Sequence, residues 1–164
     1  MEEQSAGRGH LPGTGHLPGA RPAGNDLPQP RAGGPEPVLE VAGVVEHGDA
    51  RGRTLGFPTA NVAVPAHGLR DGVWAGTVQV GQDVHVAAVS VGHRPTYYGR
   101  EGARLLEAHL LDFSGDLYGR EVLVRLHVRL RPQRRFSGSA DLVEQLHRDV
   151  ADTRTWAAWA LARA

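Results

Sequence analysis

Short runs rich in β-branched residues, separated by turn residues, constrain the fold of this chain more than any other feature. Such runs between turn signals are typical of strands, and the last one alternates apolar with polar residues, which predicts one buried face. They cover residues 38–46, 73–80, 84–91, 104–111 and 121–130. No helical pattern separates neighbouring runs, so the chain is predicted to be all-β, as an antiparallel barrel or sandwich.

One helix is expected after the last strand. Ser139 is its predicted N-cap, with Asp141 in the first turn. An apolar stripe at four-residue spacing, continued by two tryptophans, predicts that this helix lies against the sheet: Leu142, Leu146, Val150, Trp156 and Trp159. Thr153 and Thr155 are weaker helix formers, and an interruption there is the alternative.

The first 37 residues differ from the rest, with 8 glycines, 7 prolines and few large apolar side chains. Such a segment buries too little apolar surface to offset its ordering entropy, so residues 1–37 are expected to form a disordered tail before one domain at 38–164. The formal net charge is zero, which gives no reason to expect a nucleic-acid or membrane partner. The absence of cysteine agrees with a cytoplasmic protein.

The segment 48–61 has the chemistry of a polyphosphate site. Its glycines at 48, 52 and 56 let backbone N–H groups approach an anion, and Arg51 and Arg53 add positive charge. The segment misses the Walker A spacing by one residue and has arginine in place of lysine. Pro58 also makes a helix running through it unfavourable, so a different phosphate loop is predicted.

Oxygen-bearing side chains follow this loop. Thr59 and Asn61 lie two residues apart in an extended stretch, so both can reach one hard cation such as Mg²⁺. A structural role in a turn is an equally good interpretation.

Two further segments have candidate chemistry. Glu107 lies among leucines on a predicted strand and suits a general base. In the commoner arrangement, however, one face of such a strand is exposed, and Glu107 and His109 would both face solvent. The turn 131–136 combines arginines with Phe136 and suits a planar aromatic ligand. A solvated surface turn is the alternative. No histidine pair has helical zinc spacing, and no Gly-x-Ser-x-Gly motif surrounds Ser90.

Several motifs in one order resemble the riboflavin kinase (flavokinase) family. They are Gly48-Asp-x-Arg-Gly-Arg-Thr-Leu-Gly-Phe-Pro-Thr-Ala-Asn61, Gly72-Val-Trp-Ala75, Val89-Ser-Val-Gly-x-x-Pro-Thr96, Leu106-Glu-Ala-His-Leu-Leu-Asp-Phe113, Asp116-Leu-Tyr-Gly119, Leu130-Arg131 and Arg135-Phe-Ser137. The similarity covers about residues 41–153. It implies a six-stranded antiparallel Greek-key β-barrel with a C-terminal helix, whose extra strand lies within 60–64. It also implies transfer of the ATP γ-phosphate to the riboflavin 5′-hydroxyl, giving FMN and ADP.

The resemblance assigns roles to residues of this sequence. Glu107 becomes the catalytic base, and Thr59 and Asn61 hold Mg²⁺. The flavin contacts are Arg131, Arg134 and Phe136. ATP, the co-substrate, is expected to lie against Gly48, Arg51, Gly52, Arg53, Thr54, Gly56, Leu110, Asp112 and Tyr118.

The expected partners are therefore riboflavin, FMN, ATP and ADP, with no nucleic acid and no membrane, and the expected state is a cytoplasmic monomer. FAD synthesis is not expected, because only the Pro/Gly-rich tail precedes the barrel. One alternative is a catalytically silent flavin- or nucleotide-binding module on the same barrel. A barrel that acts only in protein interaction is another, although it leaves the loop chemistry unused.

Overall fold

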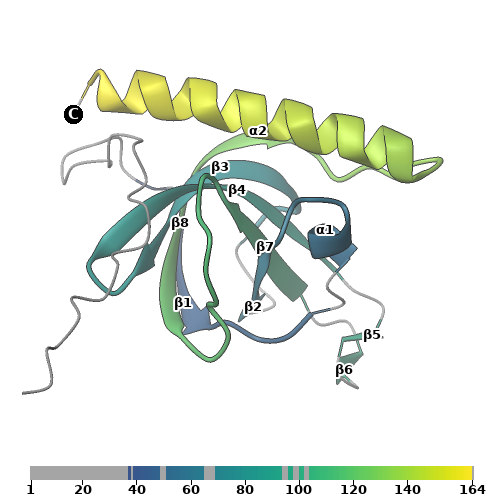
Figure 1. The fold of residues 1–164 in the computed structure, drawn as a ribbon, viewed down its shortest axis with the longest axis horizontal. Coiled ribbons are helices and arrows are strands. Elements are labelled where there is room, and N and C mark those ends of the chain that lie inside the picture. The colour runs from purple at the N-terminus through teal and green to yellow at the C-terminus, as the bar shows by residue number, and fades with distance from the viewer. Residues whose placement is uncertain are drawn as a thin grey trace, which may run out of the picture.

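A computed structural model describes residues 37, 39–48, 51–64, 69–93, 96–97, 100–101 and 104–163 (Figure 1). Apart from residue 37, the expected disordered tail lies outside the described residues. Six strands form the main sheet: β1 (Leu39–Val44), β2 (Ala60–Val64), β3 (Gly72–Val80), β4 (Asp83–His93), β7 (Arg104–Leu110) and β8 (Glu121–Arg131). Short strands β5 (Thr96–Tyr97) and β6 (Arg100–Glu101) pair separately, and the helices are α1 (Arg51–Thr54) and α2 (Ser139–Leu161).

The six strands form the predicted Greek-key barrel. Their order is β1-β8-β3-β4-β7-β2, with every pairing antiparallel. Strands β3, β4 and β7 follow one another, and β8 returns to lie beside β3, which is the Greek-key arrangement. All five predicted runs are strands, and the sixth strand lies at 60–64, where the resemblance put it.

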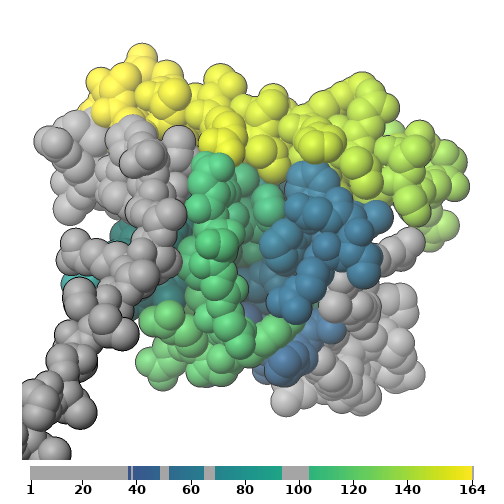
Figure 2. All heavy atoms as spheres, viewed as in Figure 1, coloured from purple at the N-terminus to yellow at the C-terminus, as the bar shows by residue number. Residues whose placement is uncertain are grey.

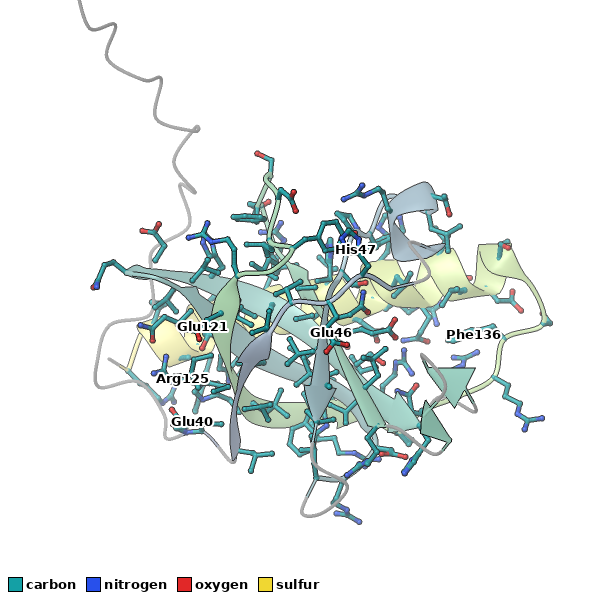
Figure 3. The ribbon with its side chains drawn as sticks, turned by 90° about the horizontal axis from the view of Figure 1, so that it is seen from below. Glu40, Glu46, His47, Glu121, Arg125 and Phe136 are labelled. Atoms are coloured by element: carbon teal, nitrogen blue, oxygen red, sulfur yellow. The ribbon has the colours of Figure 1, made fainter. Side chains whose placement is uncertain are left out.

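The seam between β1 and β2 nearly closes the barrel. The Glu46 N–H donates to the Asn61 carbonyl at 2.8 Å, just beyond the end of β1. Further along, a Cβ on Gly43 would lie 2.5 Å from Cγ1 of Val62, so glycine allows the two strands to approach closely. On the other side of β1, Glu40 pairs with Arg125 of β8 at 2.6 Å (Figure 3).

Two apolar clusters hold the fold together. The barrel interior contains Val62, Trp74, Val78, Val89, Val91, Leu106, Val124 and Leu126, among others. The second cluster lies between the outer face of the barrel and α2, and contains Ala75, Val86, Leu111, Trp156 and Ala160. Strand β3 is buried on both faces because it contributes to both clusters, which explains its nearly continuous apolar sequence.

Helix α2 lies along the top of the barrel, as predicted, but differs in detail (Figures 1 and 2). Its N-cap is Gly138 rather than Ser139, and no side chain caps it. The threonines do not interrupt it, because Thr153 Oγ1 and Thr155 Oγ1 donate to the carbonyls of the residues four positions earlier, at 2.7 and 3.0 Å. Among the described residues, no helix combines the length and apolar character needed to cross a bilayer.

The buried face of α2 is also not the predicted one. Trp156 is buried, as expected, but Trp159 is 46% exposed, with the Arg163 guanidinium 4.5 Å from its ring centroid. Before Trp156 the buried residues of the helix are polar: Gln145, Asp149 and Thr153. The apolar stripe of Leu142, Leu146 and Val150 is only half-buried, because it lines a cavity.

Candidate functional site

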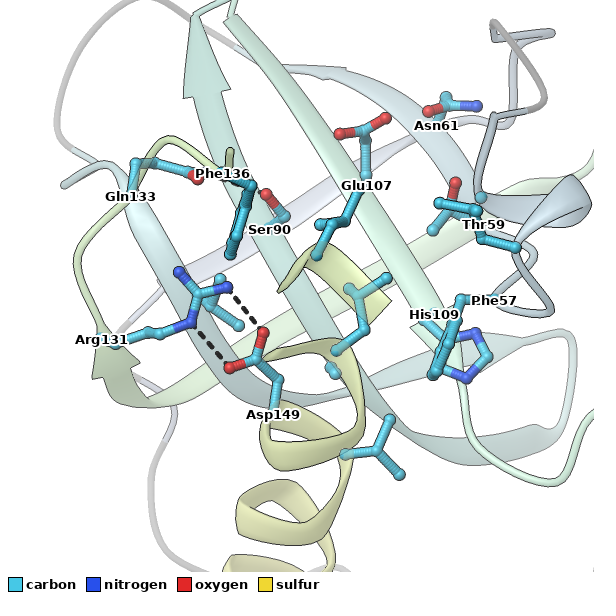
Figure 4. A pocket seen from close by; sticks show the side chains of 17 residues that line it. Phe57, Thr59, Asn61, Ser90, Glu107, His109, Arg131, Gln133, Phe136 and Asp149 are labelled. Carbon is cyan, nitrogen blue, oxygen red and sulfur yellow. Dashed lines mark hydrogen bonds and ion pairs between the residues drawn. The ribbon is translucent and has the colours of Figure 1, made fainter. Parts of the chain in front are cut away.

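A cavity of about 260 Å³, called here the helix cavity, lies between the barrel wall and the first half of α2 (Figure 4). Strands β2, β3, β4 and β7 and the last residue of β8 supply one side, and α1, the segment after it, the turn before α2 and α2 itself supply the rest. Its lining residues are Gly52, Leu55, Phe57, Thr59, Asn61, Val73, Ala88, Ser90, Glu107, His109, Arg131, Gln133, Phe136, Leu142, Leu146, Asp149 and Val150.

Glu107 lies at the centre of the strand wall of this cavity. Its register partners are Asn61 on β2 and Ser90 on β4, so the three side chains share one face of the sheet. His109 lies two residues further on the same face, with its Nδ1 2.9 Å from the Pro58 carbonyl oxygen. Both Glu107 and His109 are partly buried and line the cavity, so the alternative of a solvent-facing strand does not describe this wall.

Asn61 has the environment of a cation ligand. The residue is only 5% exposed, and within the described part of the chain its Oδ1 has no hydrogen-bond partner. A buried oxygen without a partner is costly, and a hard cation is the kind of ligand that satisfies it. Thr59 contributes a hydroxyl to the same cavity wall, so the pair fits a divalent ion such as Mg²⁺.

A second cavity of about 310 Å³, called here the loop cavity, lies between the segment around α1 and the β7–β8 connection. These two segments lie side by side beneath α2 in Figure 2. The lining residues are Val45, Arg53, Pro58, Thr59, Ala60, Leu110, Phe113, Ser114, Gly115, Asp116, Leu117 and Tyr118. Tyr118 stacks on His47 with ring centroids 3.7 Å apart. Thr59 lines both cavities, whereas Asn61 lines only the helix cavity, so both cavities border one residue of the predicted metal site.

The predicted phosphate loop contains one short helix. Helix α1 spans only Arg51–Thr54 and ends before Pro58, so no helix runs through the segment. Gly52 is needed for close packing, because a Cβ there would lie 2.3 Å from the Phe57 carbonyl oxygen, whereas Gly56 is needed for its φ of 86°.

The predicted nucleotide residues do not all lie in one cavity. Arg53, Leu110 and Tyr118 line the loop cavity, and Gly52 lines the helix cavity. Gly48 packs against the Asn61 side chain. Thr54, Gly56 and Asp112 line neither cavity, and the Arg51 side chain lies outside the described residues.

Asp112 ties the end of β7 to α2. Its carboxylate accepts two hydrogen bonds from Arg154 at 2.8 and 2.9 Å. These bonds hold the pKa of Asp112 below its ordinary value, even though partial burial acts in the opposite direction. A nucleotide-binding role for this side chain stays a prediction.

The arginines of the turn before α2 are held by the helix rather than free in solvent. Arg131 donates from Nε and Nη2 to the two carboxylate oxygens of Asp149, at 2.7 Å each (Figure 4). Arg134 donates to Gln145 Oε1 at 2.8 Å. The Phe136 ring centroid lies 4.9 Å from the Arg134 guanidinium carbon and 5.9 Å from that of Arg131. Arg131 is half-buried, whereas residues 132–135 are exposed, so the alternative of a solvated surface turn still describes Arg134 in part.

Some lining residues were not predicted. Gln133 Nε2 donates to Ser90 Oγ and to the Val91 carbonyl oxygen, both at 2.9 Å, and fastens the turn to β4. Asp149 and Phe57 also line the helix cavity. For Asp149, the sequence does contain a signal. Gln145, Asp149 and Thr153 are spaced four residues apart, which places three polar side chains on one face of the helix.

The two cavities share Thr59 as a lining residue, and they lie on a six-stranded Greek-key barrel covered by one long helix. Residues 36–157 match the flavokinase family model, described as riboflavin kinase, and the chain belongs to that family.

Two of the three similar proteins below have riboflavin kinase in their description, and the third is described as a macrolide-efflux protein. The chain is 36% identical over 112 residues to the bifunctional riboflavin kinase/FMN adenylyltransferase of Bacillus subtilis, covering 66% of this chain and 35% of that relative. The solved structure of a macrolide-efflux protein from Streptococcus pneumoniae is 38% identical, with a TM-score of 0.65 over 73% of this chain and 39% of the other. The riboflavin kinase of Trypanosoma brucei is 26% identical, with a TM-score of 0.52 over 71% of this chain and 78% of the other.

Proposed function

We propose that this protein phosphorylates the 5′-hydroxyl of riboflavin with ATP, giving FMN and ADP. The observation that carries the proposal is that Thr59 lines both cavities, while Asn61 and Glu107 are register partners on the wall of the helix cavity. A phosphoryl donor in one cavity and a hydroxyl acceptor in the other would have their reacting ends near Thr59. Phosphoryl transfer requires mainly positioning and neutralisation of charge, and this arrangement suits both.

The helix cavity is the proposed flavin site. Apolar side chains of α2 and the Phe136 ring offer a surface for a planar ring system, and aromatic rings prefer stacked or edge contacts with such ligands. The loop cavity is the proposed nucleotide site, where Arg53 adds a permanent positive charge and Tyr118 an aromatic ring. For Arg53, Leu110, Tyr118, Arg131 and Phe136, this distribution agrees with the contacts that the family resemblance implies, whereas Gly52 lines the other cavity and Arg134 lines neither.

Glu107 is the proposed general base. Its carboxylate would accept the proton of the ribityl 5′-hydroxyl while the oxygen bonds to the γ-phosphorus and ADP leaves. Thr59 and Asn61 would hold a divalent cation, which supplies charge neutralisation for the phosphates when it is bound. Orientation of the hydroxyl and exclusion of water from the helix cavity fall to the surrounding side chains.

The direct test is incubation of the protein with riboflavin, ATP and Mg²⁺, with FMN measured by chromatography. We expect FMN formation in the wild type. Glu107→Gln should lower kcat by about 10²- to 10⁴-fold, the usual contribution of a general base, and leave riboflavin affinity nearly unchanged. The matched control is Glu121→Gln, the same change at an exposed residue on β8, outside both cavities (Figure 3).

A silent binding module is the alternative outcome. Riboflavin binding without any FMN would overturn the kinase proposal and favour that module. Unchanged turnover of Glu107→Gln, with FMN formed by the wild type, would instead remove only the assignment of Glu107 as base.

A further inference from the structure

A buried polar network on α2 is the feature from which we draw a further inference. Asp149 is 2% exposed and Gln145 is 9% exposed. Both Asp149 oxygens accept from Arg131, and Oδ1 also accepts from Gln145 Nε2 at 3.0 Å. Gln145 in turn accepts from Arg134 through Oε1. One carboxylate and one amide of the helix thus hold two guanidinium groups of the turn.

Packing of the helix does not require this network. On the same buried face, the second half of α2 meets the barrel through Trp156 and Ala160. A buried ion pair is costly to desolvate, and apolar residues of similar volume often stabilise a fold as well or better. The buried charge lies where α2 passes the helix cavity, which Asp149 and Arg131 both line (Figure 4).

The network ends on an aromatic ring. Both anchored guanidinium groups lie within 5.9 Å of the Phe136 ring centroid, at a distance where a cation and a ring attract each other. Phe136 is part of the cavity lining and lies near the beginning of α2 (Figure 3). The position of this ring therefore depends on two guanidinium groups, and their positions depend on Asp149 and Gln145.

We propose that Asp149 and Gln145 are positioning residues that hold Arg131, Arg134 and Phe136 against the ring system of riboflavin. This inference rests on the proposed function, since it assumes that the flavin occupies the helix cavity. Among the described residues, the hydrogen bonds that make up this network join Asp149, Gln145, Arg131 and Arg134, and Glu107, Thr59 and Asn61 are not among them. Its loss should therefore weaken the binding of the flavin ring and leave the chemical step nearly intact.

The variant Asp149→Asn tests the inference, because an uncharged amide cannot replace the paired carboxylate of the bidentate contact. We expect the Kd for riboflavin, measured by flavin fluorescence without ATP, to rise about tenfold, the effect of losing one hydrogen bond to a charged group. The KM for riboflavin should rise in parallel, while kcat at saturating riboflavin stays within about twofold.

A second variant keeps the inference testable if Asp149→Asn fails to fold. Gln145→Leu leaves the two Arg131–Asp149 hydrogen bonds in place and removes the bonds of Gln145 to Arg134 and to Asp149. The Kd should rise by about fivefold, less than for Asp149→Asn, because Arg134 is exposed and solvent weakens its contact. Asp152→Asn is the matched control, because Asp152 is exposed on the same helix and its loss should change neither constant.

The outcomes separate the inference from the proposed function. A wild-type protein that binds riboflavin, with folded Asp149→Asn or Gln145→Leu variants of unchanged Kd, overturns the inference alone. A fall in kcat with unchanged KM also overturns it, because that pattern places the network in the chemical step. Absence of riboflavin binding by the wild type overturns the proposed function, and the inference with it.

Discussion

Asn61 combines three roles in one residue. Its backbone carbonyl accepts the Glu46 N–H at the barrel seam, and its Oδ1 is buried without a partner among the described residues. Its amide nitrogen lies against Gly48, where a Cβ would approach it to 2.2 Å. Gly48 was predicted to offer its N–H to a phosphate. In the structure its lack of a side chain instead leaves room for the side chain of Asn61, the predicted metal ligand.

Gly48→Ala is expected to disturb the metal site, because the added methyl must displace the Asn61 side chain. The Mg²⁺ concentration required for half-maximal FMN formation should rise about tenfold, the effect of losing a well-placed ligand orientation. Gly138→Ala is the matched control, since a Cβ at Gly138 meets no atom within 4 Å. An unchanged Mg²⁺ requirement in Gly48→Ala would show that Asn61 is not the ligand that this contact positions.

His85 gives the second prediction at this scale. The residue is buried on β4, with its ring centroid 5.0 Å from that of Phe113, and burial holds its pKa below the ordinary 6.5, although Asp83 acts in the opposite direction. As the pH falls below 6.5, the unfolded chain binds a proton that the folded chain does not, so this residue lowers the free energy of unfolding.

Urea unfolding at several pH values measures this effect. The wild type should lose stability between pH 7 and pH 5 more steeply than His85→Gln, which has no titrating group at this position. Identical slopes for the two proteins would contradict the argument. The quantity compared is the change in the free energy of unfolding with pH. Any loss of stability that the substitution causes equally at every pH therefore cancels.

At the scale of elements, α2 shows what the sequence can and cannot predict. Strand positions followed from β-branched runs between turns, because burial on one or both faces leaves a direct signature in composition. The helix was predicted correctly, but its buried face was not. The apolar stripe of Leu142, Leu146 and Val150 lines a cavity, whereas Gln145 and Asp149 are buried by mutual hydrogen bonds.

The site could be predicted only in part for a related reason. Residues clustered in sequence, such as Thr59 and Asn61, were found through local spacing. Gln133 and Asp149 line the cavity through partners on other elements, β4 and β8 respectively. A local sequence pattern carries no information about a hydrogen-bond partner on a distant element. The roles of Gln133 and Asp149 therefore could not be predicted without the fold.

The two tryptophans of α2 test the observed burial directly. Trp156 packs in the second apolar cluster, so Trp156→Ala should lower the free energy of unfolding by about 3–5 kcal/mol. Trp159 is exposed, and Trp159→Ala should change it by no more than about 0.5 kcal/mol. Denaturation followed by circular dichroism measures both. Equal losses would mean that the two rings are buried alike.

At the scale of the whole molecule, one barrel supports two cavities that share a single side chain. The outer faces of β2, β4 and β7 supply the wall of the helix cavity, while α1 and the β7–β8 connection form the loop cavity next to it. Helix α2 is fastened on both sides by ion pairs, Arg131 with Asp149 and Asp112 with Arg154. The barrel therefore holds α1, the β7–β8 connection and α2 in the relative positions that form the two cavities.

The seam between β1 and β2 links the stability of the barrel to its ligands. The Glu46 N–H and the Asn61 carbonyl form the bridge there, and the side chain of the same asparagine faces the proposed metal site. Any ligand that fixes Asn61 must also reduce local opening of the bridge. The Glu46 amide should then exchange its hydrogen with solvent more slowly once nucleotide and Mg²⁺ are added, so one backbone amide reports on occupancy of the site without any turnover.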